Sequence, residues 1–548
     1  MPDLRAVESN ALSQTNFSTL DWIIVAGYLA VSVVIGLMVR RYASSMKNYI
    51  TAGRGLGTWL GIATMTGTEL GLVTVMYSAE KGYKGGFAAF HIAILAGAVT
   101  LLVGLTGFIV ASLRREKVLT IPEFYEKRFG RRTRILGGIV LAFGGILNMG
   151  LFLKVGSEFI VGVTGMSADS AALQWVMTTL LALVLFYTVL GGMISVVITD
   201  YIQFVVLSFG LLLTVLIAIF TLGWDHIFAT VQDRLGPSGF DPLASGGQFG
   251  VEYVSWMALL GLVGCAIWPT AVARALAMES PQAVKRQYIW SSISFTIRFL
   301  LPYVLGICAF VYVATEAADL QNLFPVNAEE MSDPSKGSKV RYAMPIFLGK
   351  ILPIGILGLI SAAMIAAFMS THDSYLLTWS SVLTQDVVAP LRRQELSNRA
   401  RIWLTRAFII LIGIFLWLWG VIYPVGEDLW DYMAITGAIY FTGAIPVLIG
   451  GLYWKRASST GAFWSLVVGT SAVLGLAPLR KIVGGFILRL IDHAPALATE
   501  KGYDEAALAM LTGERVGLFC IAMTMIVFVV GSLLFPDREP TAAISEES

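Results

Sequence analysis

Residues 55–80 read GLGTWLGIATMTGTELGLVTVMYSAE, an apolar run long enough to cross a membrane that carries clustered glycines, threonines and one carboxylate near its middle. Each unsatisfied polar group in hydrocarbon costs several kcal/mol, so this segment cannot be a plain lipid-facing helix. Residues 251–272 read VEYVSWMALLGLVGCAIWPTAV, with Gly261, Gly264 and a Trp268-Pro269 step near the centre. We predict that both segments are helices broken at mid-membrane. Close helix packing at glycine and a simple proline kink are the alternatives.

The composition is that of a polytopic membrane protein. Of the 548 residues, 56% are hydrophobic and 14% are charged, and the mean hydropathy is +0.75. This excludes a soluble enzyme and a disordered chain, and the lipid bilayer is the expected partner. The net charge of +2 favours no nucleic-acid partner. No phosphate-binding loop, metalloprotease or nucleophile-elbow motif occurs, so no enzyme activity is expected.

Apolar runs of about 20 residues predict about thirteen transmembrane helices. They fall near 21–39, 55–80, 86–113, 135–164, 172–191, 193–222, 251–272, 286–315, 343–387, 403–423, 428–453, 459–477 and 513–535. The run at 343–387 is too long for one straight span, so a short interfacial helix is expected to lead into it.

Lysine and arginine gather in alternate loops, which the positive-inside rule places in the cytoplasm. The basic loops lie at 40–54, 114–134 and 392–401. The N-terminus is then outside and the C-terminus inside. The first residues lack the apolar core of a cleavable signal peptide. The expected location is the plasma membrane, or the inner membrane if the chain is bacterial.

The two interrupted spans are the second and the seventh, which suggests two inverted five-helix repeats with a solute site at the midplane. The expected fold class is an all-α polytopic membrane protein with about 13 transmembrane helices. The predicted segments are an extracellular tail (1–20), a first helix and cytoplasmic loop (21–54), the repeats (55–222 and 251–453), peripheral helices (454–535) and a cytoplasmic tail (536–548).

Four motifs resemble the sodium/solute symporter family, which includes sodium/proline, sodium/pantothenate and sodium/galactose-type transporters. They are AGRGLGTW at 52–59, LTIPEFYEKRFG at 119–130, YTVLGGMISVVITDYIQ at 187–203 and AAFMSTHDSYLLTWSSVLTQDVV at 366–388. Their order and spacing cover about residues 20–460. The resemblance implies a leucine-transporter-like fold, Na+ as the co-transported ion and alternating access.

The resemblance also implies a sodium site between the first broken helix and the eighth core helix. Its oxygen ligands would be the carbonyls of Gly67, Leu70 and Ala367 and the hydroxyls of Ser370 and Thr371. Neutral oxygens suit a hard cation that must also leave. The alternative for the two hydroxyls is hydrogen bonding to carbonyls of their own helix.

A second cation site, or an exit path, would use Asp200, Asp373 and Ser374. Relatives with this second site have two hydroxyls where this chain has Asp373 and Ser374. Two carboxylates could hold sodium more strongly, share a proton, or merely face the cytoplasmic exit.

The predicted solute pocket is walled by Glu69, Thr74, His91 and Trp268. Glu69 lies in the break, where it could tune the ion site, bind a substrate ammonium, or cap the second half of the helix. Lys154 and Glu158, four residues apart on one helix, are expected to neutralise each other.

The predicted function is a sodium-coupled secondary active symporter that imports a small organic solute by alternating access. An aromatic wall with a nearby carboxylate favours an amino acid, a betaine or another small nitrogenous solute over a sugar, vitamin or carboxylate. The alternative is a membrane solute sensor with a transporter-like core. The sequence does not indicate an oligomeric state.

Overall fold

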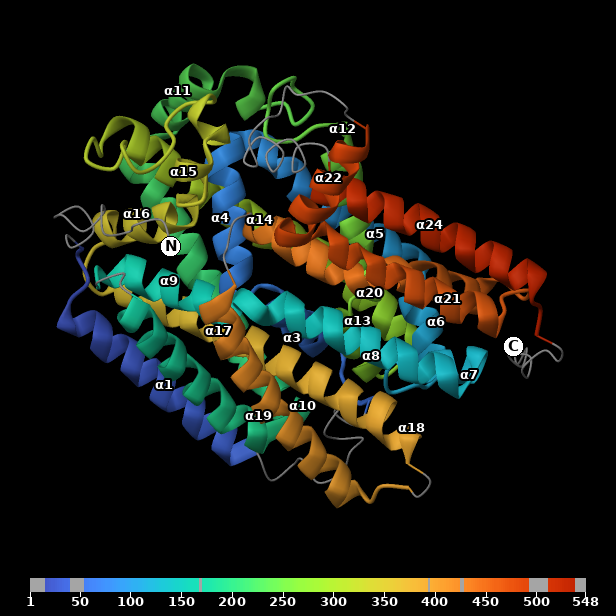
Figure 1. The fold of residues 1–548 in the computed structure, drawn as a ribbon. Coiled ribbons are helices and arrows are strands. Elements are labelled where there is room, and N and C mark those ends of the chain that lie inside the picture. Colours follow the sequence, from blue (N-terminus) through green and yellow to red (C-terminus); the bar gives the residue numbers. More distant parts are fainter. Residues whose placement is uncertain are drawn as a thin grey trace.

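The structure, a computed structural model, describes residues 15–39, 54–166, 170–392, 395–423, 428–491 and 511–537. Long helices form the bundle in Figure 1: α1 (Thr19–Val39), α3 (Thr58–Glu69), α4 (Leu72–Gly85), α5 (Phe90–Thr106), α8 (Arg131–Asn148), α9 (Phe152–Thr164), α10 (Ser170–Leu222), α12 (Val251–Leu262), α13 (Pro269–Ala277), α14 (Pro281–Thr315), α17 (Ile356–Val382), α19 (Asn398–Ile422), α20 (Leu429–Tyr453), α21 (Ser459–Gly469) and α24 (Gly513–Leu534). Shorter helices connect them: α6 (Val110–Arg115), α7 (Ile121–Phe129), α11 (Trp224–Leu235), α15 (Pro334–Gly337), α16 (Ala343–Ile351), α18 (Ala389–Leu391) and α22 (Ala477–Ile491).

All thirteen predicted segments are helical, but the two predicted at 172–191 and 193–222 are continuous in one helix, α10. Among the described residues, nine helices are long and apolar enough to cross a membrane, or ten if the bent pair Ser459–Gly475 and Ala477–Ile487 forms one span. The count is lower than thirteen because helices that join without a break, such as those within Leu72–Thr106, count once, and short apolar helices such as Thr19–Val31 do not count. The short helix expected to lead into the span within the run at 343–387 is α16, and α17 follows it from Ile356.

The first predicted break lies between α3 and α4. Leu70 (φ −96°, ψ 73°) and Gly71 (φ −87°, ψ 167°) leave the helical conformation. Gly71 makes room for a close neighbour, because a Cβ at this position would overlap the hydroxyl of Thr371 on α17. The opened backbone therefore lies directly against α17.

The second predicted break lies between α12 and α13. The helix widens into a π turn at Val263–Ile267, and Trp268 then takes an extended conformation with ψ 127°. Pro269 is the first residue of α13, where its fixed φ is suitable and its missing N–H is not needed. The proline therefore starts a new helix instead of kinking a continuous one.

Backbone hydrogen bonds join the two broken helices at one end. Leu56, just before α3, donates its N–H to the carbonyl of Ala277 (3.2 Å) and accepts from the N–H of Glu279 (3.1 Å). The beginning of α3 is thus tied to the end of α13.

Helix α14 packs beside both halves of the first broken helix. Gln287 donates its side-chain N–H to the carbonyl of Gly61 on α3 (2.8 Å). Further along, Gly82 of α4 and Gly306 of α14 bring the two backbones together, since a Cβ on either glycine would overlap the other helix's backbone. Pro302 lies within α14 between these two contacts, where it removes one backbone donor.

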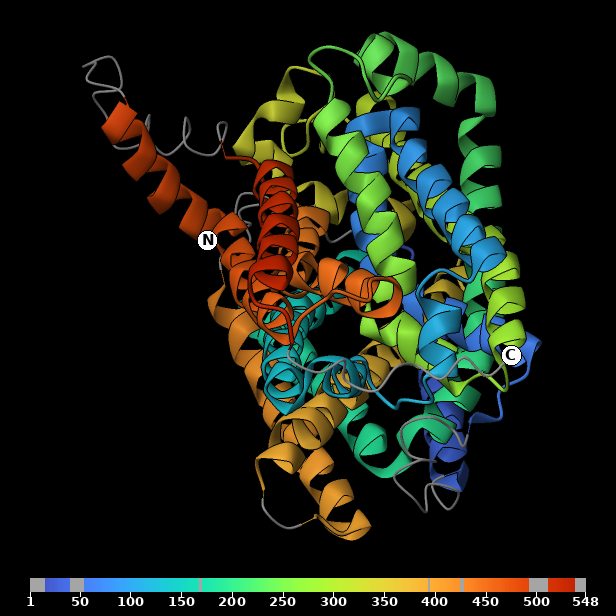
Figure 2. The same ribbon diagram turned by 90° about the vertical axis from the view of Figure 1, so that its right-hand side faces the viewer.

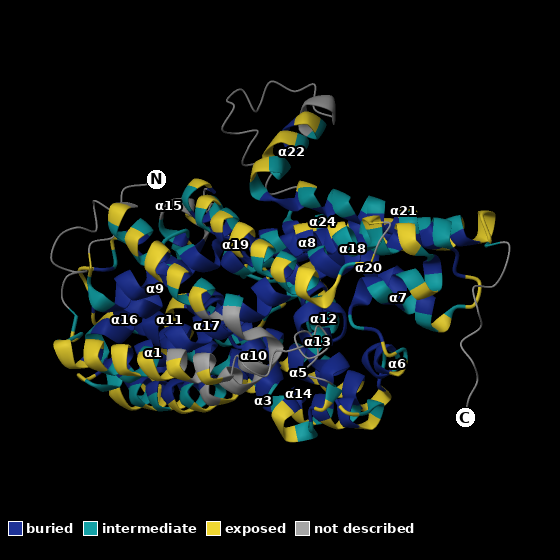
Figure 3. Cartoon of the chain, turned by 90° about the horizontal axis from the view of Figure 1, so that it is seen from below, coloured by how far each residue is buried: buried dark blue, intermediate teal, exposed yellow. Residues whose placement is uncertain are grey.

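Burial separates the centre of the bundle from its outer helices (Figure 3). In the most apolar part of the span at Ile356–Leu391, and likewise in α20, 89% of the residues are buried, against 33% in α19 and α24. The outer helices α19 and α24 therefore present apolar side chains to lipid, whereas α17 and α20 line the interior. Helix α22 extends away from the bundle (Figures 2 and 3).

Candidate ion and solute site

The break in α3–α4 places backbone carbonyls beside the hydroxyls of α17. Ser370, which is fully buried, donates its hydroxyl to the carbonyl of Gly67 at 2.7 Å. Thr371 donates to the carbonyl of Thr68 at 3.4 Å. In these contacts both hydroxyls bond to carbonyls of α3, not to carbonyls of their own helix.

The predicted ligands are therefore only partly brought together. Gly67, Ser370 and Thr371 converge, and the carbonyl of Thr68, which was not predicted, joins them. Leu70 lies in the non-helical break, and Ala367 is buried one turn before Ser370 on α17. These groups are neutral oxygens, a donor set that suits a hard monovalent cation.

An arginine that sequence reasoning missed lies at the predicted second cation site. Asp373 and Ser374 are fully buried on α17, and Arg274 of α13 donates from Nη2 to the Ser374 hydroxyl at 2.7 Å. The side chain of Asp200 is outside the described residues. Arg274 was missed because the seventh span was expected to end at residue 272, whereas the helix continues to Ala277.

A cavity adjoins the ion-site candidate. Its volume is about 120 Å³. Thr68 and Thr371 belong both to its wall and to the contact between α3 and α17. The predicted pocket residues Glu69, Thr74 and Trp268 line it as well. The cavity and the ion-site candidate therefore share two residues.

His91 is not among the residues that line the cavity. Its Nδ1 lies 2.6 Å from the carbonyl of Ala88, and its ring packs edge-on against Phe249 with centroids 4.9 Å apart. The helix α5 presents Ile92 and Ala96 to the cavity instead.

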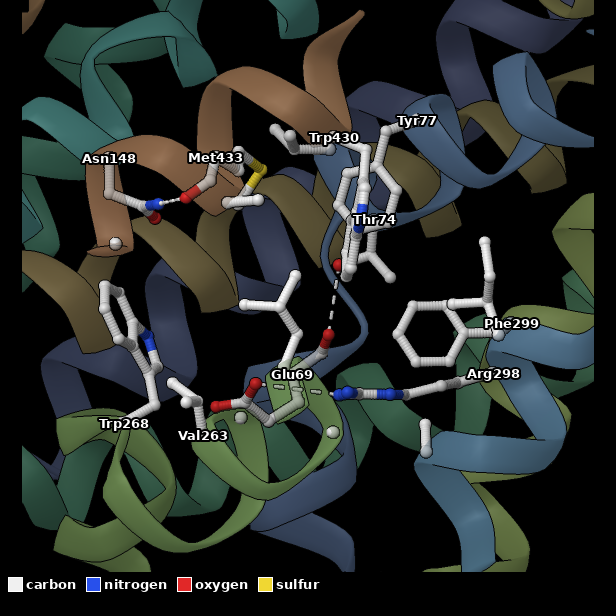
Figure 4. Close-up of a pocket in the computed structure, with 18 of the residues that line it drawn as sticks. Glu69, Thr74, Tyr77, Asn148, Val263, Trp268, Arg298, Phe299, Trp430 and Met433 are labelled. Atoms are coloured by element: carbon white, nitrogen blue, oxygen red, sulfur yellow. Dashed lines mark hydrogen bonds and ion pairs between the residues drawn. The ribbon is translucent and has the colours of Figure 1, made fainter. Parts of the chain in front are cut away.

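Glu69, the last residue of α3, has side-chain partners on α13 and α14, and Figure 4 shows the one on α14, Arg298. Its Oε1 accepts from the hydroxyl of Thr270 at 2.7 Å, and its Oε2 lies 3.6 Å from Nη1 of Arg298 on α14. The first turn of α4 has no side-chain cap on its N-cap residue Gly71. The contacts of the Glu69 carboxylate go to Thr270 and Arg298, and in the described part of the chain it has no bond to a backbone N–H at the start of α4.

Arg298 is the second functional candidate that sequence reasoning missed. Its side chain is 7% exposed and lines the cavity. The guanidinium lies over the rings of Phe295 and Phe299, 3.8 Å and 4.6 Å from their centroids. An ionisable residue within a predicted span is a functional candidate by default, and this rule, applied to 286–315, would have found it.

Aromatic side chains form the remaining walls. Trp268 donates its indole N–H to the hydroxyl of Tyr375 (2.9 Å), and the rings of Tyr77 and Trp430 lie 4.4 Å apart between centroids. Asn148 donates to the carbonyl of Met433 at 2.7 Å, while its buried Oδ1 has no hydrogen-bond partner. The cavity thus combines flat apolar walls with a few fixed polar atoms (Figure 4).

Ion pairs connect α4 to the beginning of α20. Lys81 and Lys84 both contact Asp428, at 2.8 and 2.5 Å, and Lys81 also contacts Asp431. Burial alone would raise the pKa of Asp428, but the attraction of the two lysines is stronger and lowers it.

The expected pair of Lys154 and Glu158 is not formed. Glu158 instead binds Nε of Arg341 at 2.8 Å, and Lys154 donates to the carbonyl of Tyr423 at 3.2 Å. Arg341 lies in the connection before α16, so the spacing of four residues on α9 could not reveal it.

Comparison with known proteins identifies the family of this chain. The family model described as "Sodium:solute symporter family" matches residues 49–469. The chain is 24% identical to the sodium/glucose cotransporter of Vibrio parahaemolyticus, over 82% of this chain and 83% of the relative. It is 23% identical to the sodium/proline symporter of Escherichia coli, over 87% and 94%.

Among solved structures, a Na+-coupled sialic acid symporter in a substrate-bound outward-open state aligns with a TM-score of 0.72 and 22% identity, covering 95% of this chain and 100% of that one. This likeness shows the fold, a leucine-transporter-like arrangement of two inverted five-helix repeats whose first helices are broken. The relatives are transporters and not enzymes. With the family model matching most of its length, the chain belongs to the sodium:solute symporter family, and it is a sodium-coupled, multi-pass membrane transporter of a small solute.

Proposed function

We propose that the chain uses the inward sodium gradient to import a small nitrogenous solute, an amino acid or a betaine, by alternating access. The observation that carries the proposal is the shared wall between the cavity and the ion-site candidate, formed by Thr68 and Thr371. Occupation of one site changes the packing and the field felt in the other, which is the physical requirement for coupling.

The choice of solute rests on the cavity walls. Trp268, Tyr77 and Trp430 offer flat aromatic faces, which attract a cationic nitrogen or an apolar ring. The polar atoms that could read a ring of sugar hydroxyls are few, since Thr74 donates to the carbonyl of Glu69 and Thr270 donates to its carboxylate. A small solute with one or two charged groups suits such a lining better than a sugar does.

We also propose that the N-terminus lies outside and the C-terminus in the cytoplasm. Two basic loops that were predicted to be cytoplasmic meet at one end of the bundle. Arg134 and Arg401 both bind Gln385, through its carbonyl at 2.9 Å and its side-chain oxygen at 3.0 Å. Their meeting supports a common side for the two loops, and the positive-inside rule makes that side cytoplasmic.

Uptake into proteoliposomes tests the proposal. Vesicles that contain the purified chain are given labelled amino acids, betaines, sugars, vitamins and carboxylates, each with an inward sodium gradient and with potassium in its place. We expect accumulation of an amino acid or a betaine in sodium only. Accumulation of a sugar alone would refute the choice of solute, and a chain that binds a solute but moves none would favour the sensor.

A further inference from the structure

Arg298 is held in one orientation inside the cavity. It lies on α14, and only 7% of it is exposed. The rings of Phe295 and Phe299, one turn apart from each other on the same helix, lie against the guanidinium. Stacking on aromatic faces leaves the in-plane N–H groups of an arginine available for acceptors.

Two of the three guanidinium nitrogens of Arg298 have no hydrogen bond to the protein. Nε and Nη1 are buried and have no hydrogen-bond partner. Oε2 of Glu69 lies 3.6 Å from Nη1, beyond hydrogen-bond distance, and Oε1 of Glu69 is already bound by Thr270. A buried charged donor without an acceptor is costly, so a ligand that supplies an acceptor gains the full value of the contact.

The charges at the cavity lead to the same conclusion. Among the residues that line it in the described part of the chain, Glu69 and Arg298 are the two with a formal charge, and these charges cancel. A sodium ion at the neighbouring carbonyls and hydroxyls adds one positive charge. A carboxylate on the solute would supply a negative group beside these positive charges in a site of low dielectric, where a charge without a counter-charge is expensive.

We propose that Arg298 anchors a carboxylate of the transported solute and is the residue that makes a carboxylate necessary for transport. The inference rests on the proposed symport and narrows its solute class, because amino acids and betaines both carry a carboxylate. It also moves the main charged contact from the sequence-based candidate Glu69, whose Oε1 accepts from Thr270, to Arg298, whose Nε and Nη1 have no hydrogen-bond partner.

A second polar group, the side-chain oxygen of Asn148, lines the same cavity as Arg298. The buried Oδ1 of Asn148 accepts no hydrogen bond and lies on the far side of Glu69 from Arg298 (Figure 4). A solute whose carboxylate binds Arg298 would direct its opposite end toward Asn148 and Trp268, between the aromatic walls. An amino nitrogen would then find an acceptor, whereas a solute without N–H would contact only the rings.

Pairs of solutes that differ only in the carboxylate test the proposal on the wild-type chain. They are proline and prolinamide, glycine betaine and choline, and lactate and propane-1,2-diol, each measured as sodium-driven uptake and as a competitor of the best substrate. We expect only carboxylate members to be carried or to compete. Sodium-driven uptake of a solute without a carboxylate would overturn the role of Arg298 and leave symport intact, whereas no sodium-driven uptake of any compound would overturn both proposals.

Variants separate an anchor from a structural ion pair. Arg298→Gln should raise the half-saturating concentration of the carboxylate solute by about ten- to a hundredfold, since a charge-assisted contact is lost, and Arg298→Lys should restore part of it. Arg286→Gln makes the same change at an exposed position of α14 and should leave uptake unchanged. If Arg298→Gln does not fold, Arg298→Lys and the wild-type pairs still decide. Unaltered carboxylate affinity and selectivity in a folded Arg298 variant would overturn the proposal.

Discussion

The hydroxyl of Ser370 provides the sharpest test of the ion site. Replacing Ser370 by alanine removes a fully buried oxygen that lies 2.7 Å from the carbonyl of Gly67 and is within reach of any cation bound in the break. Thr371→Ala removes a second oxygen, which lies farther from its carbonyl partner at 3.4 Å. We expect both variants to weaken sodium binding, and Ser370→Ala to weaken it more.

The size of the effect follows from the kind of contact. A hydrogen-bonding group that contacts a charge contributes about 1.5–3 kcal/mol, so each lost oxygen should raise the half-activating sodium concentration by about 10- to 150-fold. The losses combine in the double variant, which should show no sodium-driven uptake at attainable concentrations. About five oxygens were expected at this site, and a coordination shell of that size has no spare ligand.

The assay is sodium activation of uptake in proteoliposomes, with a matched control on the same helix. Ser380 is also fully buried on α17, and its hydroxyl donates to the carbonyl of Leu377 at 3.2 Å, away from the break. Ser380→Ala should leave the sodium constant unchanged. Normal sodium affinity in the folded double variant, with uptake retained, would refute the placement of the ion.

Three further variants examine the surroundings of the site. Glu69→Gln removes the negative charge beside Arg298 and should raise the half-activating sodium concentration about ten- to a hundredfold; unchanged sodium activation would contradict this. A cation held by the Ser374 hydroxyl would lie about 5 Å from the guanidinium of Arg274, which corresponds to a repulsion of about 3 kcal/mol. Sodium activation of uptake should therefore be non-cooperative in the wild type and become cooperative in Arg274→Gln. Cooperative activation of the wild type would show that a second ion binds despite the arginine. Asp428→Asn should lower the melting temperature at neutral pH, because the pKa of Asp428 is lowered in the folded protein. The carboxylate therefore stabilises the fold at pH values above the unfolded pKa of about 3.9, and this stabilisation is lost as the pH falls through the lower folded pKa. Equal melting temperatures of the two proteins from pH 5 to 8 would contradict that role.

Local sequence was sufficient for the helices and for both breaks. Apolar runs set the segments, and the glycine and threonine cluster before Gly71 and the step at Trp268-Pro269 mark where the backbone opens. The hydroxyls of Ser370 and Thr371 could be placed because the family resemblance connects α3 to α17. The helices, the two breaks and the two hydroxyls could be predicted because each depends on residues close in sequence or on a motif.

The arginines could not be assigned roles in the same way. Arg298 meets Glu69 across 229 positions, and Arg274 meets Ser374 across 100. Arg298 lies inside a predicted apolar run and Arg274 lies two residues beyond the end of another, and a run that predicts a helix says nothing about which way either charge points. The direction of His91 had the same difficulty, because α5 turns its neighbours Ile92 and Ala96 to the cavity.

Pro302 and the break at Leu70–Gly71 together determine which parts of the protein can tilt. Before Pro302, α14 is held to α3 by Gln287, and beyond it Gly306 locks α14 to α4. The broken helix α3–α4 and the helix α14 thus each have one point where they can bend. The segments beyond these two points, α4 and the end of α14, pack against each other. Arg298 precedes the proline and Glu69 precedes the break, so both lie in the segments before the two bending points. A joint tilt of the two segments beyond these points would therefore move the cavity-lining residues of α4 while Glu69 and Arg298 stayed beside each other.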